Sequence, residues 1–261
     1  MRKIYKVGGK TLISVTPFRQ KVLLKLQEQG KRKMHIPDGF ISPTISIVTF
    51  IVTLLFWIIS FMKAKNSLDE RQIPIMGVMT ALFFAAQMMN YPIVGGTTGH
   101  LLGSASLGII LGPYAGCISM TIILVLQSLL FGDGGITTLG ANIVNMGIIG
   151  VFIPAFLLLA LNKISKGKGL YAWIFISAFV GDVVAAVAAG AELGFSVPTF
   201  QYGLSVAVPA MAINHSVIGV IEGVVTMVLV GMLLKLRPDV LSKSPSLKDL
   251  PALQESKELK E

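Results

Sequence analysis

Two histidine-containing segments of the chain could together hold one divalent metal ion. Residues 34–39 read Met-His-Ile-Pro-Asp-Gly, and residues 95–100 read Gly-Gly-Thr-Thr-Gly-His. In a chain that began at Met34, the free α-amine, the amide nitrogen of His35 and the His35 imidazole would close two fused chelate rings, and His100 would add a fourth nitrogen. Four nitrogens in a square suit Ni²⁺ or Cu²⁺, and low-spin Co²⁺ less commonly. The alternative is that both histidines are hydrogen-bonding residues at a membrane surface.

A second group of polar residues lies within apolar segments. His215 follows Asn214, and Glu222 comes seven residues later, two helical turns along the same face. Ionisable groups inside a membrane span face the bundle interior or a cavity. We favour a structural hydrogen-bond network for them over a supporting or gating role beside the metal. The candidate partners of His215 in such a network are Asn142, Asn145 and Asp182.

The composition defines the class of protein that must position these residues. The chain has 261 residues, a mean hydropathy of +0.76, 53% apolar residues and only 13% charged residues. Soluble domains carry about 25% charged residues. The composition therefore predicts an all-α, polytopic membrane protein, and it excludes a cytosolic enzyme, a disordered chain and a disulfide scaffold. The long unbroken apolar runs exclude a transmembrane barrel.

Seven apolar segments follow residue 40, and we expect about seven transmembrane helices, one of them short. They cover 41–62, 73–90, 100–111, 113–131, 140–161, 170–191 and 208–236. Lys and Arg occur between the first and second segments, between the fifth and sixth, and after the seventh, but not in the other loops after the first segment. Basic loops remain in the cytoplasm. This rule predicts an outside position for residues 34–40 and His100, and a cytoplasmic C-terminus.

The first 33 residues conflict with that orientation. They hold ten Lys or Arg against one acid, Glu28, and so carry the whole net charge of +9. Such a basic arm is typical of solvated, irregular chain, and it would have to be translocated outward. We expect that 1–33 is an upstream overcall of the start or is removed. The expected domains are this arm, a metal-chelating N-terminus (34–40), a helical bundle (41–236) and a polar cytoplasmic tail (237–261).

The two histidine segments carry a family resemblance. Met-His-Ile-Pro-Asp-Gly-Phe at 34–40 and Gly-Gly-Thr-Thr-Gly-His-Leu-Leu-Gly at 95–103 resemble the CbiM/NikM family, the substrate-capture (S) components of energy-coupling factor (ECF) cobalt and nickel importers. In that family the mature chain starts Met-His, and a second ligand histidine lies 66 residues after that Met, as His100 does after Met34. The resemblance implies that Met34, His35 and His100 bind the metal. With the arm attached, Met34 has no free amine.

The resemblance also implies partners. Members of this family dock a transmembrane coupling (T) protein through small residues on an early helix, and Gly77, Ala81 and Ala85 form such a stripe at four-residue spacing. The alternative for this stripe is packing within the chain itself. The sequence has no complete P-loop, so cytoplasmic ATPase subunits would supply the energy. A small accessory membrane subunit is a further possible partner, and besides lipid we expect neither nucleic acid nor a resident cofactor.

These observations together predict a metal-binding cell-membrane component of an ATP-driven importer for Co²⁺ or Ni²⁺, and not an enzyme. The ion would be a transported substrate. One rival is a proton-coupled secondary transporter that uses Asp182, His215 and Glu222. Another is a membrane-embedded enzyme with His215 and Glu222 in its active site. Neither rival explains why a Met-His pair and a distant histidine are both expected at the outer face.

Overall fold

The computed structural model describes residues 4–7, 10–13, 35–65, 72–250 and 253, and it divides into two compact units, Met1–Lys33 and Met34–Glu261. In the first unit, β1 (Ile4–Val7) and β2 (Lys10–Ile13) form an antiparallel hairpin. The expectation of irregular chain is wrong for these eight residues. Both strands contain β-branched or aromatic residues, and a Gly-Gly pair separates them in sequence, a combination that favours hairpins.

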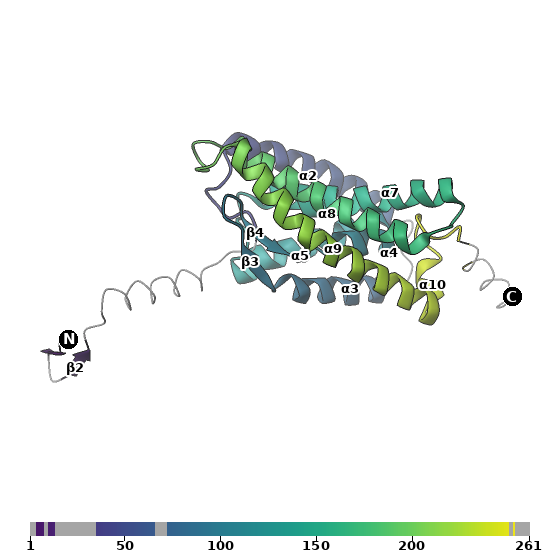
Figure 1. Ribbon diagram of the computed structural model, residues 1–261, viewed down its shortest axis with the longest axis horizontal. Helices are drawn as coiled ribbons and strands as arrows, with labels where there is room; N and C mark the ends of the chain where they lie inside the picture. Colours follow the sequence, from purple (N-terminus) through teal and green to yellow (C-terminus); the bar gives the residue numbers. More distant parts are fainter. Residues whose placement is uncertain (1–3, 8–9, 14–34, 66–71, 251–252, 254–261) are drawn as a thin grey trace. The chain divides into compact units, whose positions relative to one another are not determined.

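Long apolar helices make up the second unit (Figure 1). In the described part of the chain, five helical segments are long and apolar enough to cross a membrane. They are α2 (Pro43–Ala64), α5 (Pro113–Phe131), the continuous stretch Leu139–Ser165, α8 (Leu170–Gly194) and α9 (Leu204–Leu236). Helix α3 (Gln72–Gln87) is apolar but has 16 residues. The expected all-α, polytopic membrane fold is confirmed, with a helix in each of the seven apolar segments.

Lipid-facing surface is most evident on α2. Its side chains Ile47, Ile51 and Leu54 are each more than half exposed, and only 17% of the residues in its most apolar 18-residue stretch are buried. A soluble protein would not expose so continuous an apolar face to water. The stretch Leu139–Ser165 is more enclosed and consists of α6 (Leu139–Asn142), the π-helix η1 (Ile143–Ile149) and α7 (Gly150–Ser165), with Pro154 inside α7.

The segment expected as a short helix at 100–111 is composite. Strands β3 (Asn90–Pro92) and β4 (Thr98–His100) pair in antiparallel register, Asn90 with His100, and helix α4 (Ser104–Leu111) begins four residues after His100. Strand β4 and helix α4 lie toward opposite ends of the bundle (Figure 1).

Two polar side chains bind the backbone of this segment where it is not helical. The amides of Leu102 and Gly103 donate to Oε2 of Glu222, at 3.1 and 3.0 Å, and the Leu102 carbonyl accepts from Nε2 of Gln87 at 2.6 Å. Backbone groups at membrane depth have no water to bind and must be satisfied within the protein. Gly103 has a φ of 72°, a left-handed conformation that glycine adopts readily, and helix α4 begins at the next residue, Ser104.

Helix α4 packs closely between α5 and α7 because glycines remove side chains at its contacts. A Cβ added at Gly108 would lie 2.4 Å from the Val151 carbonyl oxygen, and one at Gly116 would lie 2.9 Å from the Leu107 carbonyl carbon. All of α4 except Leu111 is buried. The short helix is therefore an internal element of the bundle, enclosed by protein.

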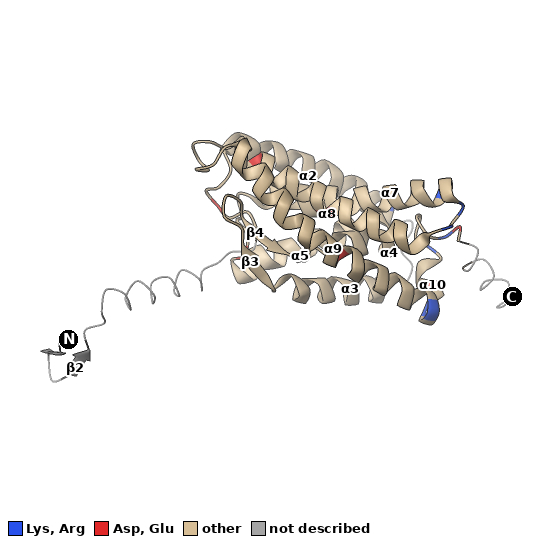
Figure 2. Cartoon of the chain, in the orientation of Figure 1, with Lys and Arg blue, Asp and Glu red and all other residues tan. Residues whose placement is uncertain are grey.

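The two ends of the bundle differ in charge (Figure 2). Lys163, Lys166 and Lys168 lie at the α7–α8 turn, and Lys235 and Arg237 precede α10 (Pro238–Leu241). We call this the basic end. The opposite end holds the β3–β4 hairpin and is called the histidine end.

The segment expected as a polar tail, 237–261, packs onto the basic end as far as the structure describes it. Its leucines are buried at Leu241, Leu247, Leu250 and Leu253. The hydroxyl of Ser244 donates to the carbonyl of Ile109 in α4, and Nδ2 of Asn162 donates to the carbonyl of Ser246. Leucines spaced through a charged sequence thus attach this segment to the bundle.

Candidate metal centre

Residues 35–42 enter the histidine end of the bundle and are held there by hydrogen bonds. The amide of Ile36 donates to Oδ1 of Asn142 at 3.1 Å, and the Ile36 carbonyl accepts from the Gly135 amide at 3.0 Å. The Asp38 carboxylate accepts from the Thr137 amide and hydroxyl, at 2.8 and 2.6 Å. These contacts fix the backbone on both sides of Pro37, so the His35 side chain has a defined position. Met34 lies outside the described residues.

A relay of amide side chains sets the tautomer of His35. Nε2 of Gln87 donates to the Leu102 carbonyl, and Oε1 of Gln87 accepts from Nε2 of Gln127 at 3.0 Å. Oε1 of Gln127 therefore faces Nε2 of His35, 2.8 Å away. Because this oxygen can only accept, His35 donates from Nε2 and keeps its lone pair on Nδ1. Nδ1 is the nitrogen that can chelate a metal together with the residue's own amide.

His100 presents its other nitrogen. Its Nδ1 donates to the carbonyl of Leu101 at 3.0 Å, so the lone pair is on Nε2. The His35 and His100 rings meet edge to face, with centroids 4.9 Å apart and planes inclined by 80°. Both histidines are at least 94% buried. The structure thus brings together the two histidines that the sequence singled out.

The electrostatics of the two rings favour neutral imidazole. Burial lowers the pKa of His35, and the nearby Asp133 carboxylate and the Gln127 hydrogen bond oppose this only partly. Burial also lowers the pKa of His100 well below its usual value, and the neighbouring His35 adds to that shift. Neutral imidazole is the form that binds metals, so both rings are ready to act as ligands at neutral pH.

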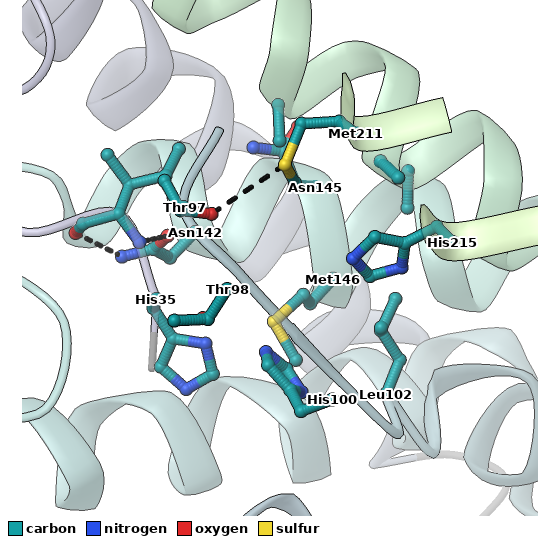
Figure 3. Close-up of a pocket in the computed structure, with 14 residues that line it drawn as sticks. His35, Thr97, Thr98, His100, Leu102, Asn142, Asn145, Met146, Met211 and His215 are labelled. Atoms are coloured by element: carbon teal, nitrogen blue, oxygen red, sulfur yellow. Dashed lines mark hydrogen bonds between the residues drawn. The ribbon is translucent and has the colours of Figure 1, made fainter. Parts of the chain in front are cut away.

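A pocket of about 40 Å³ lies between these rings and the middle of the bundle (Figure 3). Its lining includes His35, His100, His215, Asn142, Asn145 and Met146. In the parts of the chain that the structure describes, no three His, Cys, Asp or Glu side chains are grouped as a ready metal site. A metal ion here would thus need backbone nitrogens as well, which is the role expected for the amine of Met34 and the amide of His35.

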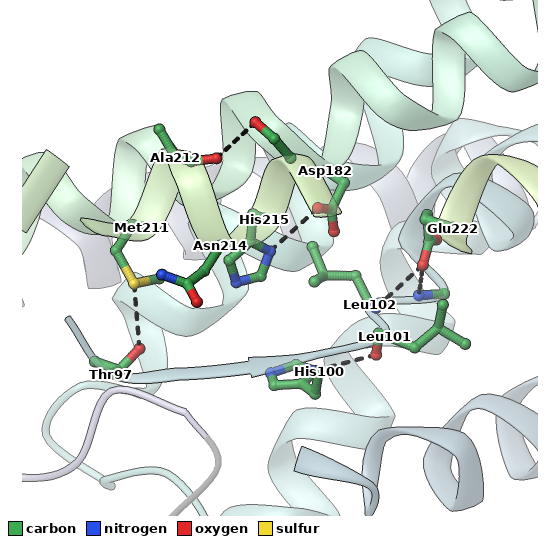
Figure 4. Close-up of polar contacts among 12 residues, drawn as sticks. Thr97, His100, Leu101, Leu102, Asp182, Met211, Ala212, Asn214, His215 and Glu222 are labelled. Carbon is green, nitrogen blue, oxygen red and sulfur yellow. Dashed lines mark hydrogen bonds and ion pairs between the residues drawn. The ribbon is translucent and has the colours of Figure 1, made fainter. Parts of the chain in front are cut away.

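The other polar residues predicted for this region separate into three places (Figure 4). His215 lines the pocket and bonds Oδ2 of Asp182 through Nδ1, at 3.1 Å, so its partner in the expected network is Asp182. Glu222 binds the backbone at Leu102 and Gly103. Asn214 donates to the Ala210 carbonyl and faces the Tyr91 hydroxyl at 3.5 Å, and it is absent from the pocket lining.

Sequence reasoning missed Gln87 and Gln127. Both are fully buried and lie in or at the end of apolar helices, α3 and α5. A buried amide in a membrane span is costly unless its hydrogen bonds are satisfied, so each glutamine in these spans was a detectable signal. Their partners were not detectable, because Gln87, Gln127 and His35 are distant in sequence.

The small-residue stripe lies on the outer face of α3. Gly77, Ala81 and Ala85 are all exposed, and nothing lies within 4 Å of a Cβ built on Gly77. Gly77 and Ala81 line an apolar groove of about 530 Å³ between α3 and α5. The stripe therefore does not pack against another helix of the described chain.

A lipid-facing helical bundle that encloses a small pocket of neutral, buried imidazoles defines a multi-pass membrane protein with an internal cation-binding pocket. Water-soluble binding proteins lack such an apolar exterior, and the pocket contains no nucleophile positioned by a base among its lining residues. The class indicated by fold and site is that of a membrane transport protein for a metal ion.

The chain belongs to the CbiM family, because the family model described as the cobalt uptake substrate-specific transmembrane region matches residues 35–240. It is therefore a metal-uptake transport protein in the membrane and not an enzyme, and the rival interpretation as a membrane-embedded enzyme is wrong. The matched region contains His35, His100, Asp182, His215 and Glu222.

Related proteins cover most of the chain. A putative fused nickel transport protein of Archaeoglobus fulgidus is 39% identical over 210 residues, which are 80% of this chain and 68% of that protein. The cobalt transport protein CbiM of Thermosipho melanesiensis is 31% identical over 208 residues, 77% of this chain and 87% of the relative. A crystal structure of a truncated transition metal transporter is 37% identical, with a TM-score of 0.73, and covers 77% of this chain and 98% of its own.

Proposed function

We propose that this chain captures Ni²⁺ or Co²⁺ for an ATP-driven importer of the energy-coupling factor type. Four nitrogens would bind the ion: the amine of Met34, the amide and Nδ1 of His35, and Nε2 of His100. The observation that carries the proposal is the contact between the His35 and His100 rings, each of which bonds a fixed acceptor through one nitrogen and leaves the other free. A ligand set arranged before the ion arrives loses little entropy on binding.

The chemistry of these donors supports both metals and favours nickel. The amide and Nδ1 of one histidine close a six-membered chelate ring, and the preceding amine closes a second ring that shares the amide nitrogen. Planar four-nitrogen ligation suits Ni²⁺. The related proteins are named for nickel in Archaeoglobus fulgidus and for cobalt in Thermosipho melanesiensis.

Charge supports an outward-facing pocket. The loop lysines of α7–α8 and the Lys235–Arg237 pair mark the basic end, and cytoplasmic loops carry the excess of Lys and Arg. His35 and the β3–β4 hairpin lie at the other end. An ion would therefore enter from outside the cell, and tight planar ligation suits capture better than rapid flux through a channel.

Partners would supply energy and coupling. The sequence holds no complete P-loop, so release of a tightly held ion would depend on cytoplasmic ATPase subunits. The exposed stripe Gly77–Ala81–Ala85 and its groove offer a close-approach surface to a helix of the T protein, because small residues allow membrane helices to pack tightly. A small accessory membrane subunit would be a further member of the complex.

The competing function is proton-coupled secondary transport through Asp182, His215 and Glu222. The buried His215–Asp182 pair favours it, since proton relays in transporters use such groups. Glu222 fits it less well, because one carboxylate oxygen already binds two backbone amides. The rival predicts metal uptake driven by a pH gradient into vesicles that contain this chain alone, whereas the proposal predicts none without ATPase subunits.

Metal titration tests the proposed site. The mature N-terminus is first identified by mass spectrometry, and Ni²⁺ is then titrated into purified protein and into the variants His35→Ala and His100→Ala. Both variants should bind Ni²⁺ at least about tenfold more weakly, while Ser216→Ala, which loses only a bond to the Ala212 carbonyl, should match the wild type. Unchanged affinity in both histidine variants would refute the site.

A further inference from the structure

The third histidine has an unused nitrogen in the metal pocket. His215 is 3% exposed and bonds Asp182 through Nδ1, which leaves Nε2 buried with no hydrogen-bond partner in the described structure. His215 lines the same pocket as His100 and Met146 (Figure 3). A buried polar atom without a partner costs free energy, so its retention calls for a ligand.

The arrangement of this histidine matches that of metal ligands in general. A ligating imidazole usually donates its other N–H to a carboxylate or a carbonyl, which fixes the ring and makes the free nitrogen more basic. Asp182 gives His215 such a partner, just as the Leu101 carbonyl does for His100 and Gln127 does for His35. All three histidines of the sequence therefore line one pocket, and each bonds a fixed partner through one ring nitrogen.

Unpartnered carboxyl oxygens on the elements around His215 also suit a cation. Oδ1 of Asp182 and Oε1 of Glu222 are buried without a hydrogen-bond partner, and no Lys or Arg is buried in the described part of the chain. Glu222 lies two turns beyond His215 on α9 (Figure 4). Ionisable residues inside membrane spans mark ion pathways, and buried oxygens without a partner are available to an ion that enters this region.

We propose that Nε2 of His215 and Nε2 of His100 form a second, inner metal position, which an ion occupies after it leaves the chelate of Met34 and His35. Water molecules complete the coordination, and the pocket of about 40 Å³ has room for an ion with a water. This inference rests on the proposed function, because it takes the same ion from the same outer site. His100 belongs to both positions, so the ion moves inward without losing all its nitrogen ligands at once.

A purely structural His215–Asp182 pair is the alternative. Such a pair would use Nδ1 alone, and replacing Nε2 by a group that cannot bind metal would leave every metal position unchanged. The variant His215→Gln separates the two cases, because its amide nitrogen can still donate to Asp182 while its oxygen is a weak ligand for Ni²⁺ or Co²⁺.

The experiment titrates Co²⁺ into purified full-length protein, with calorimetry and visible absorption as readouts. We compare the wild type with His35→Ala and with three double variants. Each double variant combines His35→Ala with His215→Gln, His215→Ala or Ser216→Ala. We expect His35→Ala to retain a weaker Co²⁺ site. Adding either His215 substitution should weaken that site by about tenfold or more and change its absorption, whereas adding Ser216→Ala should have no effect. His215→Gln alone, titrated with Ni²⁺, shows whether the outer site and the fold persist.

Each result has one meaning. If the His35→Ala and His35→Ala/His215→Gln proteins bind Co²⁺ equally, or if His35→Ala binds none, the inner position is overturned and the outer site stands. If His35→Ala binds as tightly as wild type, the proposed outer chelate is overturned instead.

Discussion

The imidazoles of His35 and His100 meet edge to face, with ring centroids 4.9 Å apart, although the two residues are 65 positions apart in sequence. One ring is held by the Gln127 side chain and the other by the Leu101 carbonyl. Each hydrogen bond leaves free the nitrogen that a metal would need. The contact therefore joins the segment before helix α2 to strand β4 of the β3–β4 hairpin, and both rings have defined tautomers.

Gln127 should control metal affinity without touching the metal. Gln127→Leu removes the acceptor of the His35 Nε2 proton, so the ring can change tautomer and orientation, and Ni²⁺ affinity should fall about 10- to 100-fold. Gln127→Glu retains an acceptor and should lose less. Calorimetric titration of both variants checks this. Equal affinities for wild type and Gln127→Leu would show that the relay does not position His35.

Metal binding should release protons and weaken as pH falls. The two buried imidazoles have lowered pKa values and are already neutral at pH 7, so they release few protons on binding. The α-amine of Met34, with an ordinary pKa of about 7.7–8.0, and the amide of His35 must lose theirs. We expect about two protons released per Ni²⁺ at pH 6.5, measured by calorimetry in buffers of different ionisation enthalpy. No proton release would contradict ligation by these two groups.

Glu222 should matter first for stability. Glu222→Leu leaves the amides of Leu102 and Gly103 without an acceptor at membrane depth, and two such losses cost about 2–6 kcal/mol. Glu222→Gln keeps one carbonyl oxygen and should be milder. Thermal unfolding in detergent measures the difference. A Glu222→Leu protein as stable as wild type would mean that these amides find other partners.

Gly77 offers a test of partner docking that spares the metal site. Gly77→Ala should not destabilise the protein, because the added Cβ meets nothing within 4 Å and alanine favours a helix by about 1 kcal/mol. Gly77→Trp should fill the groove between α3 and α5, and thereby lower ATP-driven uptake in cells while Ni²⁺ binding to the purified protein stays unchanged. Normal uptake by Gly77→Trp would exclude this face as the coupling surface.

The sequence predicted the helices well because lipid imposes a simple rule. A membrane span needs a long apolar run whatever its neighbours are, so each of the seven segments contains a helix. The rule failed at 100–111, where His100 lies in strand β4, Gly103 has a left-handed conformation, and Glu222, 120 residues beyond Leu102, accepts from the backbone amide of Leu102. It also missed the packing of the C-terminal leucines, which are too dispersed to form an apolar run.

The site was predictable only in part, for a related reason. Met34, His35 and His100 stand out in the sequence because their donor atoms have a distinctive chemistry, and the structure brings the two histidines together. The glutamines that orient His35 stand out only as polar residues in apolar spans, and their role depends on hydrogen bonds between α3 and α5 that no sequence pattern records. The β1–β2 hairpin was missed because the basic charge of residues 1–33 suggested irregular chain.

The most direct test of the central claim compares two proteins that differ only at the start. One begins at Met34 and the other keeps the preceding 33 residues, with both N-termini verified by mass spectrometry before calorimetric titration with Ni²⁺. A four-ligand site binding with about 10–16 kcal/mol averages roughly 3 kcal/mol per ligand, so blocking the amine should weaken binding about 100-fold. Equal, tight binding by the protein that retains the arm would contradict capture of the metal through the amine of Met34.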